Sequence, residues 1–158
     1  MTANYTPLHV LFNRTLGYTG RVTTHGFVDL DHTADWAIRV QGVDLPDLFG
    51  QAAAGLLSLA DASPLPESPG SRRQIRLHAA DRETLLVRWL EELCFLLEVQ
   101  GQIPRSIRLT ISPDLSLVAD LEVGPQESPG RAIKAVTFHG LQVAHTANGL
   151  EATIVFDV

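Results

Sequence analysis

The stretch that decides the fold is the closing one, AVTFHGLQVAHTANGLEATIVFDV, residues 135–158. Within it, Asn148-Gly149 separates two runs in which apolar and polar residues alternate. An Asn-Gly pair between two alternating runs is the strongest short-range signal for an antiparallel hairpin, because both residues tolerate the positive φ angles of a tight turn. The sequence therefore predicts a C-terminal hairpin, with Asp157 following its last alternating run.

Upstream of the hairpin, two helices are predicted among further strands. The first helix is expected to run from a cap at Asp44 to about residues 60–61, and the second from a cap at Asp81 to about Gln100. An alternating run from Trp36 to Val40, ended by Gln41-Gly42, indicates a strand with one buried face. Further strands are expected in three places: a short one around residues 75–78, one at 105–111 after Pro104, and one at 115–123.

Together these elements predict an α+β fold in a single domain. We expect about six strands in mostly antiparallel or mixed sheets, with two helices and the C-terminal hairpin, rather than a doubly wound parallel sheet. The folded domain is expected to span residues 26–158. Residues 1–25 show no sustained period and are expected to form an N-terminal extension that can be disordered.

The composition is that of a globular, acidic chain. Of its 158 residues, 45% are hydrophobic and 19% charged, with a formal net charge of −6. Such a chain is a poor candidate for gripping a phosphate backbone by itself, because that needs clustered basic side chains. Lys134 is the only lysine. No stretch approaches the length of a membrane-spanning helix or a signal peptide core, so a cytoplasmic protein without membrane partners is expected.

Common catalytic motifs do not occur in the sequence. It has no glycine-rich phosphate loop, no GxGxxG, no HExxH and no GxSxG. The single cysteine, Cys94, rules out an intramolecular disulfide and a cysteine-based zinc site, and it is expected to be a small core residue. An enzyme with chemistry of its own is therefore the less favoured class.

Carboxylates at strand ends remain as candidates for binding chemistry. Asp35 directly precedes the Trp36 strand, and Asp157 lies one residue before the terminal carboxylate of Val158. If the two strands pair, their oxygen atoms could converge on a hard cation. The spacing alone leaves this open, because an aspartate at a strand end more often only solvates a turn.

The second helix and the closing stretch offer two further candidates. At about 100° per residue, Glu91 points nearly opposite the apolar face and should be solvated, whereas Glu92 falls on the border of that face. If either glutamate has a role, Glu92 is preferred, although a solvated helix flank explains both. Lys134 enters the closing hairpin from a loop, where a lysine can be a salt-bridge partner or a phosphate contact.

Four segments, taken in order, resemble the archease family. They are HTAD at residues 32–35, WLEEL at 89–93, IKAVTFH at 133–139 and FDV at 156–158. Any one of them is a weak signal, but the ordered set is specific, and the resemblance covers about residues 26–158. It implies a protein cofactor, not an enzyme, that activates an RtcB-type RNA ligase in tRNA splicing and RNA repair by promoting guanylylation and multiple turnover.

The resemblance also implies a site and its partners. A divalent metal would be bound by Asp35, Asp157 and Val158; calcium is expected first, with magnesium or manganese as alternatives. Glu92, with Glu91 in second place, and Lys134 would serve in activating the ligase. RNA and GTP would be met only through the ligase. A stand-alone metal-dependent hydrolase or a small chaperone-like protein is the alternative.

Overall fold

The computed structural model describes residues 8–11, 26–30, 36–128 and 130–158. Within these ranges it has two helices and nine strands. The helices are α1 (Leu45–Leu59) and α2 (Arg82–Glu98). The strands are β1 (Leu8–Leu11), β2 (Gly26–Leu30), β3 (Trp36–Gly42), β4 (Ser71–His78), β5 (Gln102–Ile111), β6 (Ser116–Pro125), β7 (Ala135–Thr137), β8 (Ala144–Thr146) and β9 (Gly149–Asp157).

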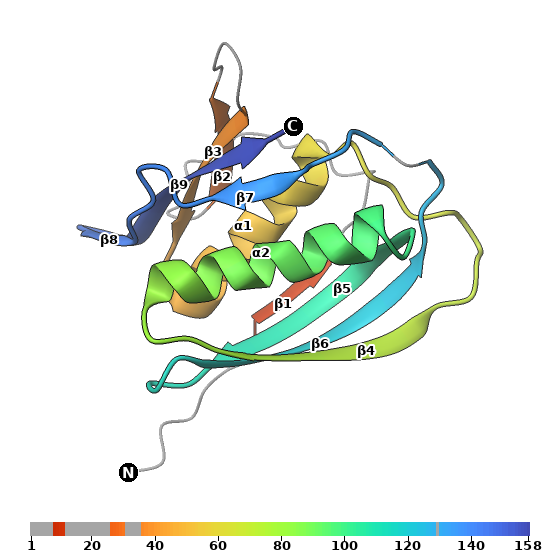
Figure 1. The fold of residues 1–158 in the computed structure, drawn as a ribbon. Coiled ribbons are helices and arrows are strands. Elements are labelled where there is room, and N and C mark those ends of the chain that lie inside the picture. The colour runs from red at the N-terminus through yellow and green to blue at the C-terminus, as the bar shows by residue number, and fades with distance from the viewer. Residues whose placement is uncertain (1–7, 12–25, 31–35, 129) are drawn as a thin grey trace.

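The strands form two antiparallel sheets with both helices between them (Figure 1). One sheet has the order β1-β5-β6-β4; the other has the order β2-β3-β9-β7, with β8 also paired to β9. This arrangement confirms the predicted α+β class. The number of strands exceeds the expected six or so, because strands of three to five residues such as β1, β2 and β7 are too short to show a clear period.

Both helices begin at the predicted caps. The Asp44 carboxylate accepts a hydrogen bond of 2.9 Å from the backbone N–H of Asp47, and the Asp81 carboxylate accepts one of 2.7 Å from that of Thr84. Such bonds satisfy N–H groups that have no partner within the first helical turn. The helices then meet in the core, where the buried indole N–H of Trp89 donates to the Phe49 carbonyl at 3.2 Å.

The prediction that Pro104 lies outside the following strand is wrong. Pro104 lies within β5, opposite Val123, and the register shifts between Pro104 and Ser106. Proline cannot donate to a sheet ladder, and an irregularity of this kind accommodates it. The local signal of the proline was therefore overridden by pairing along the rest of the strand.

Part of the N-terminal segment belongs to a sheet. Within residues 1–25, β1 pairs antiparallel with β5, with Leu8 opposite Leu109. The other residues of that segment lie outside the described ones, so their expected disorder stays a prediction. In the described ranges, neither helix is long and apolar enough to cross a membrane.

The predicted C-terminal hairpin is confirmed, with its turn one residue earlier than the Asn-Gly pair. Thr146 lies opposite Gly149, so Ala147 and Asn148 form the connection. Gly149 has a φ of 140°, and a Cβ built there would lie 2.2 Å from the Gly42 carbonyl oxygen. Glycine is thus required at this position both by its backbone conformation and by the approach of β3.

Candidate functional site

The candidate site lies where β9 ends. Phe156, which is fully buried, lies between Trp36 of β3 and Val136 of β7. The next residue, Asp157, is exposed. The last strand therefore does pair with the Trp36 strand, which was the condition for bringing the two ends of the predicted site together.

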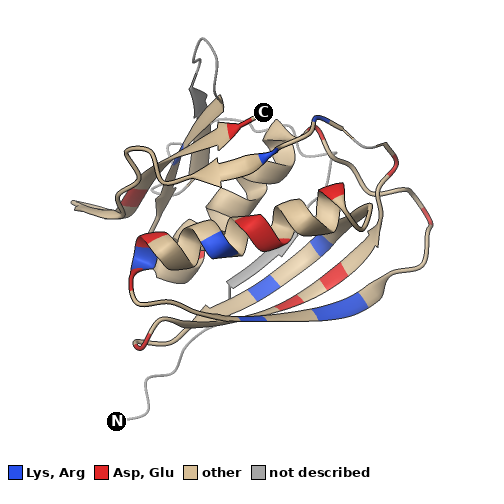
Figure 2. Cartoon of the chain, in the orientation of Figure 1, with Lys and Arg blue, Asp and Glu red and all other residues tan. Residues whose placement is uncertain are grey.

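Lys134 contacts both of the last two residues. Its backbone N–H donates to the Asp157 carbonyl at 2.8 Å, and its ammonium group donates to the backbone oxygen of Val158 at 3.0 Å. Three of the residues singled out in the sequence, Lys134, Asp157 and Val158, are thus neighbours. Lys134 directly precedes β7 and reaches them because β7 and β9 are adjacent strands. The two strands lie side by side in Figure 2.

A second cation lies near the start of β3. The guanidinium carbon of Arg131 is 5.2 Å from the centroid of the Trp36 ring, within the range of a cation–π contact. The backbone N–H of Arg131 donates to the Ala60 carbonyl at 2.7 Å, which fixes the loop before β7 against the end of α1. Trp36 of β3 and Arg131 of this loop are therefore linked by a defined contact beside the end of β9.

The donors present at this strand end match a hard cation in kind. They are the exposed carboxylate of Asp157 and the backbone oxygen of Val158, which keeps a lone pair beyond the one that Lys134 uses. No group of three His, Cys, Asp or Glu residues that could hold a metal occurs in the part of the chain that the structure describes. Asp35, the expected third ligand, lies outside it, directly before Trp36 in the chain.

The two candidate glutamates lie differently from each other on α2. Glu91 is exposed and Glu92 is partly buried, as their helical positions predicted. A groove of about 280 Å³ between α2 and β7, here called the α2–β7 groove, includes Glu91 and Lys134 among its lining residues, whereas Glu92 is not one of them. The role expected of Glu92 stays a prediction, but Glu91 is the glutamate on the side of Lys134.

The α2–β7 groove was not predicted from the sequence. Its helical side consists of residues spaced by three or four positions, which places them on one face of α2, and the side from the β7 region is apolar apart from Lys134. A detectable signal was the pair Phe95 and Val99, two large apolar residues four positions apart outside the main apolar face. The lining residues are Glu91, Cys94, Phe95, Glu98, Val99, Ile133, Lys134, Ala135 and Val136.

Cys94 lies on this groove and is only partly buried, rather than being a full core residue. Burial raises the pKa of its thiol to about 12, and the negative charges of Glu98 and then Glu91 contribute to the increase. A thiol with so high a pKa is a poor nucleophile at neutral pH. The raised pKa of Cys94 therefore reflects both its burial and the negative charge of the groove, and the thiol is not suited to be a reactive centre.

Comparisons with known proteins agree with the resemblance seen in the sequence. A model of the Archease protein family matches residues 27–158. The chain is 33% identical over 141 residues to protein archease of Methanosarcina barkeri, covering 82% of this chain and 93% of the relative. It is 31% identical over 139 residues to protein archease of Saccharolobus islandicus, covering 84% and 98%.

Two solved structures share the fold. The solution structure of Methanobacterium thermoautotrophicum protein 1598 superposes with a TM-score of 0.63 at 24% identity, covering 84% of this chain and 99% of that one. The crystal structure of an archease from Thermotoga maritima, described as a "possible chaperone", gives a TM-score of 0.61 at 21% identity, covering 82% and 94%. At these identities the likeness extends to the fold alone.

Proposed function

This chain belongs to the archease family, and from that premise we propose that it is a non-catalytic accessory protein that activates an RtcB-type RNA ligase. It would act in the cytoplasm, in tRNA splicing and RNA repair, by promoting guanylylation and repeated turnover of the ligase. The main support is one observation: Lys134 contacts Asp157 and Val158 at the end of a strand that pairs with the Trp36 strand. Two of the four family motifs, IKAVTFH and FDV, meet in that contact.

The metal would be held by Asp35, Asp157 and Val158, with calcium as the first expectation and magnesium or manganese as alternatives. When bound, it would supply a fixed positive charge suited to phosphate oxygens. The oxygen-only donors of Asp157 and Val158 support this. So does the register in which Trp36, the chain neighbour of Asp35, faces Phe156, the chain neighbour of Asp157.

Lys134 would play two parts in this site. Its hydrogen bond to Val158 orients the backbone oxygen beside Asp157. Its compact ammonium group would also help to place a phosphate of the ligase-bound GTP, as a point charge on a flexible stem. The acidic net charge of the chain fits a protein that meets RNA and GTP only through the ligase, which would itself supply the basic RNA-binding surface.

The test is multiple-turnover RNA joining by the cognate ligase, with and without this protein, followed by quantification of guanylylated ligase. We expect a large increase in joined product with the wild-type chain and none with Asp35→Ala or Asp157→Ala. Asp120→Ala, at an exposed carboxylate on the other sheet, should activate like the wild type and serves as the matched control. If the wild-type chain has no effect on guanylylation or product, the proposal is wrong.

The same experiment separates the alternative function. A stand-alone hydrolase would turn over nucleotides or phosphoesters without any ligase, and the carboxylate variants would abolish that turnover. A chaperone-like protein would suppress aggregation of unrelated proteins and would not need Asp157. Ligase-free controls with the same three variants distinguish these outcomes from ligase activation.

A further inference from the structure

The α2–β7 groove exposes large apolar side chains beside a hollow. Phe95 is 47% exposed and lies in the last turn of α2, and Val99, the residue that caps the C-terminus of α2, is 68% exposed. Ile133 and Val136 line the opposite side and belong to the buried core. Apolar surface gathered at a concave place, with charged residues around it, is typical of a site of interaction with another protein.

The charged residues of the groove are mostly acidic. Glu91 and Glu98 line it, and their charges reach into it, since both contribute to the raised pKa of the Cys94 thiol. The Glu98 carboxylate also accepts a hydrogen bond of 3.2 Å from the backbone N–H of Ile133, which holds it at the groove. Lys134 is the one cation among the described lining residues, and its ammonium group is bonded to Val158. The groove therefore favours a basic occupant.

The groove also leads to the candidate site. Lys134 lines the groove and at the same time contacts the end of β9. A partner bound between α2 and β7 would consequently have its neighbouring surface at Asp157 and Val158. An activator that binds its partner in the groove and acts on it at the candidate site needs the two to adjoin on one face of the molecule.

We infer that the α2–β7 groove is the docking surface for a basic segment of the RNA ligase that inserts a large apolar side chain between Phe95 and Val99. This inference rests on the proposed function and adds to it the surface by which the ligase is held. A ligase must present clustered Lys and Arg around its RNA site to neutralise phosphates. A segment from that region is therefore positively charged and complements the acidic groove. The apolar side chain supplies the anchor that most protein interfaces require.

Docking and activation should then separate in a titration of the ligase with this protein. The double variant Phe95→Ala/Val99→Ala should raise the concentration for half-maximal activation at least tenfold, while activation at saturation stays at the wild-type value. Both side chains are exposed, so the fold should tolerate their truncation. Asp157→Ala should do the opposite. It should abolish activation at saturation, while a direct binding measurement should give the same half-saturating concentration as for the wild type.

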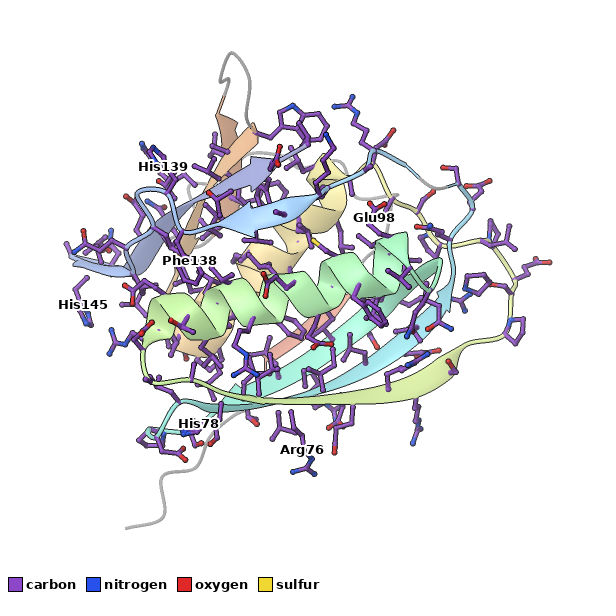
Figure 3. All side chains as sticks on the ribbon, in the orientation of Figure 1. Arg76, His78, Glu98, Phe138, His139 and His145 are labelled. Carbon is purple, nitrogen blue, oxygen red and sulfur yellow. The ribbon has the colours of Figure 1, made fainter. Side chains whose placement is uncertain are left out.

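Two further variants test the kind of occupant. Phe138→Ala is the matched control, because Phe138 is 58% exposed but lies outside the groove, toward the other end of α2 from Glu98 (Figure 3). It should leave the half-saturating concentration unchanged. Glu98→Gln keeps the acceptor for Ile133 but removes the charge, so it should weaken binding of the ligase and reduce its dependence on salt.

The outcomes distinguish this inference from the proposed function. If the wild-type chain activates the ligase and the double variant has an unchanged half-saturating concentration, the docking inference is wrong and the function stands. If the wild-type chain does not activate, direct binding of purified ligase decides: binding lost in the double variant supports the groove, and no binding or unchanged binding overturns it. A concentration-dependent dimer of this chain that the double variant abolishes would assign the groove to a second copy and overturn the inference.

Discussion

The ammonium group of Lys134 donates a hydrogen bond of 3.0 Å to the backbone oxygen of Val158, which lies 24 residues further along the chain. Its backbone N–H donates to the neighbouring residue, Asp157, at 2.8 Å. One lysine thus bonds to both of the last two residues and brings a positive charge to the end of β9. The candidate site depends on this pairing of two segments that are separated in sequence by a turn and a hairpin.

Lys134→Met should separate the role of this charge from its contribution to stability. Methionine keeps the apolar stem and removes the ammonium group. Because the bond to Val158 is exposed, the free energy of unfolding in urea should fall by less than about 1 kcal/mol. Activation of the ligase at saturating concentration should fall at least tenfold, and Lys134→Arg should restore only part of it. Full activation by the methionine variant would remove Lys134 from the proposed function.

Gly149→Ala should destabilise the fold strongly, by more than about 2 kcal/mol. The backbone there has a φ of 140°, and the added Cβ would lie 2.2 Å from the Gly42 carbonyl oxygen. Gly140→Ala is the matched control: its φ is also positive, 62°, but nothing lies within 4 Å of the added Cβ. It should cost only about 1 kcal/mol, from the left-handed conformation alone. Equal losses in thermal or urea unfolding would show that the close approach of β3 does not matter.

Cys94 should react very slowly with iodoacetamide in the native protein. With a pKa raised to about 12, its thiolate fraction at pH 8 is on the order of one in ten thousand, whereas an ordinary thiol is about one quarter ionised. Alkylation should be roughly a thousandfold slower than in urea-unfolded chain and should rise with pH up to about 12. Glu98→Gln should speed it up, because removing a nearby negative charge lowers the pKa of the thiol. Native labelling at the unfolded rate would contradict the partial burial of this side chain.

Asp81→Asn should flatten the acid side of the stability profile. The backbone N–H of Thr84, followed by its side chain, lowers the pKa of the Asp81 carboxyl below its ordinary value. Its contribution to stability is therefore complete above the unfolded-state pKa of about 3.9 and is lost as the pH falls through the lower folded-state pKa. Asparagine caps the helix without titrating. Urea midpoints measured from pH 6 down to pH 2 should fall more steeply for the wild type, and parallel profiles would exclude this linkage.

The sequence by itself determined the elements whose signals are local. Asp44 and Asp81 mark the starts of α1 and α2 because a cap bonds to backbone groups only two or three residues away. The hairpin before β9 follows from its alternating runs and the glycine at their junction. The exposure of Glu91 and the partial burial of Glu92 follow from helical periodicity.

Only the tertiary structure decided which of these elements lie side by side. That β9 lies between β3 and β7, and so brings Lys134 to Val158, depends on pairing between distant strands, which leaves no local trace in the sequence. The inclusion of Pro104 in β5 and the pairing of β1 with β5 have the same origin. The α2–β7 groove exists because β7 packs beside a face of α2 that periodicity alone predicts to be solvated. Phe95 and Val99 therefore form part of a groove only through the residues that tertiary packing places opposite them.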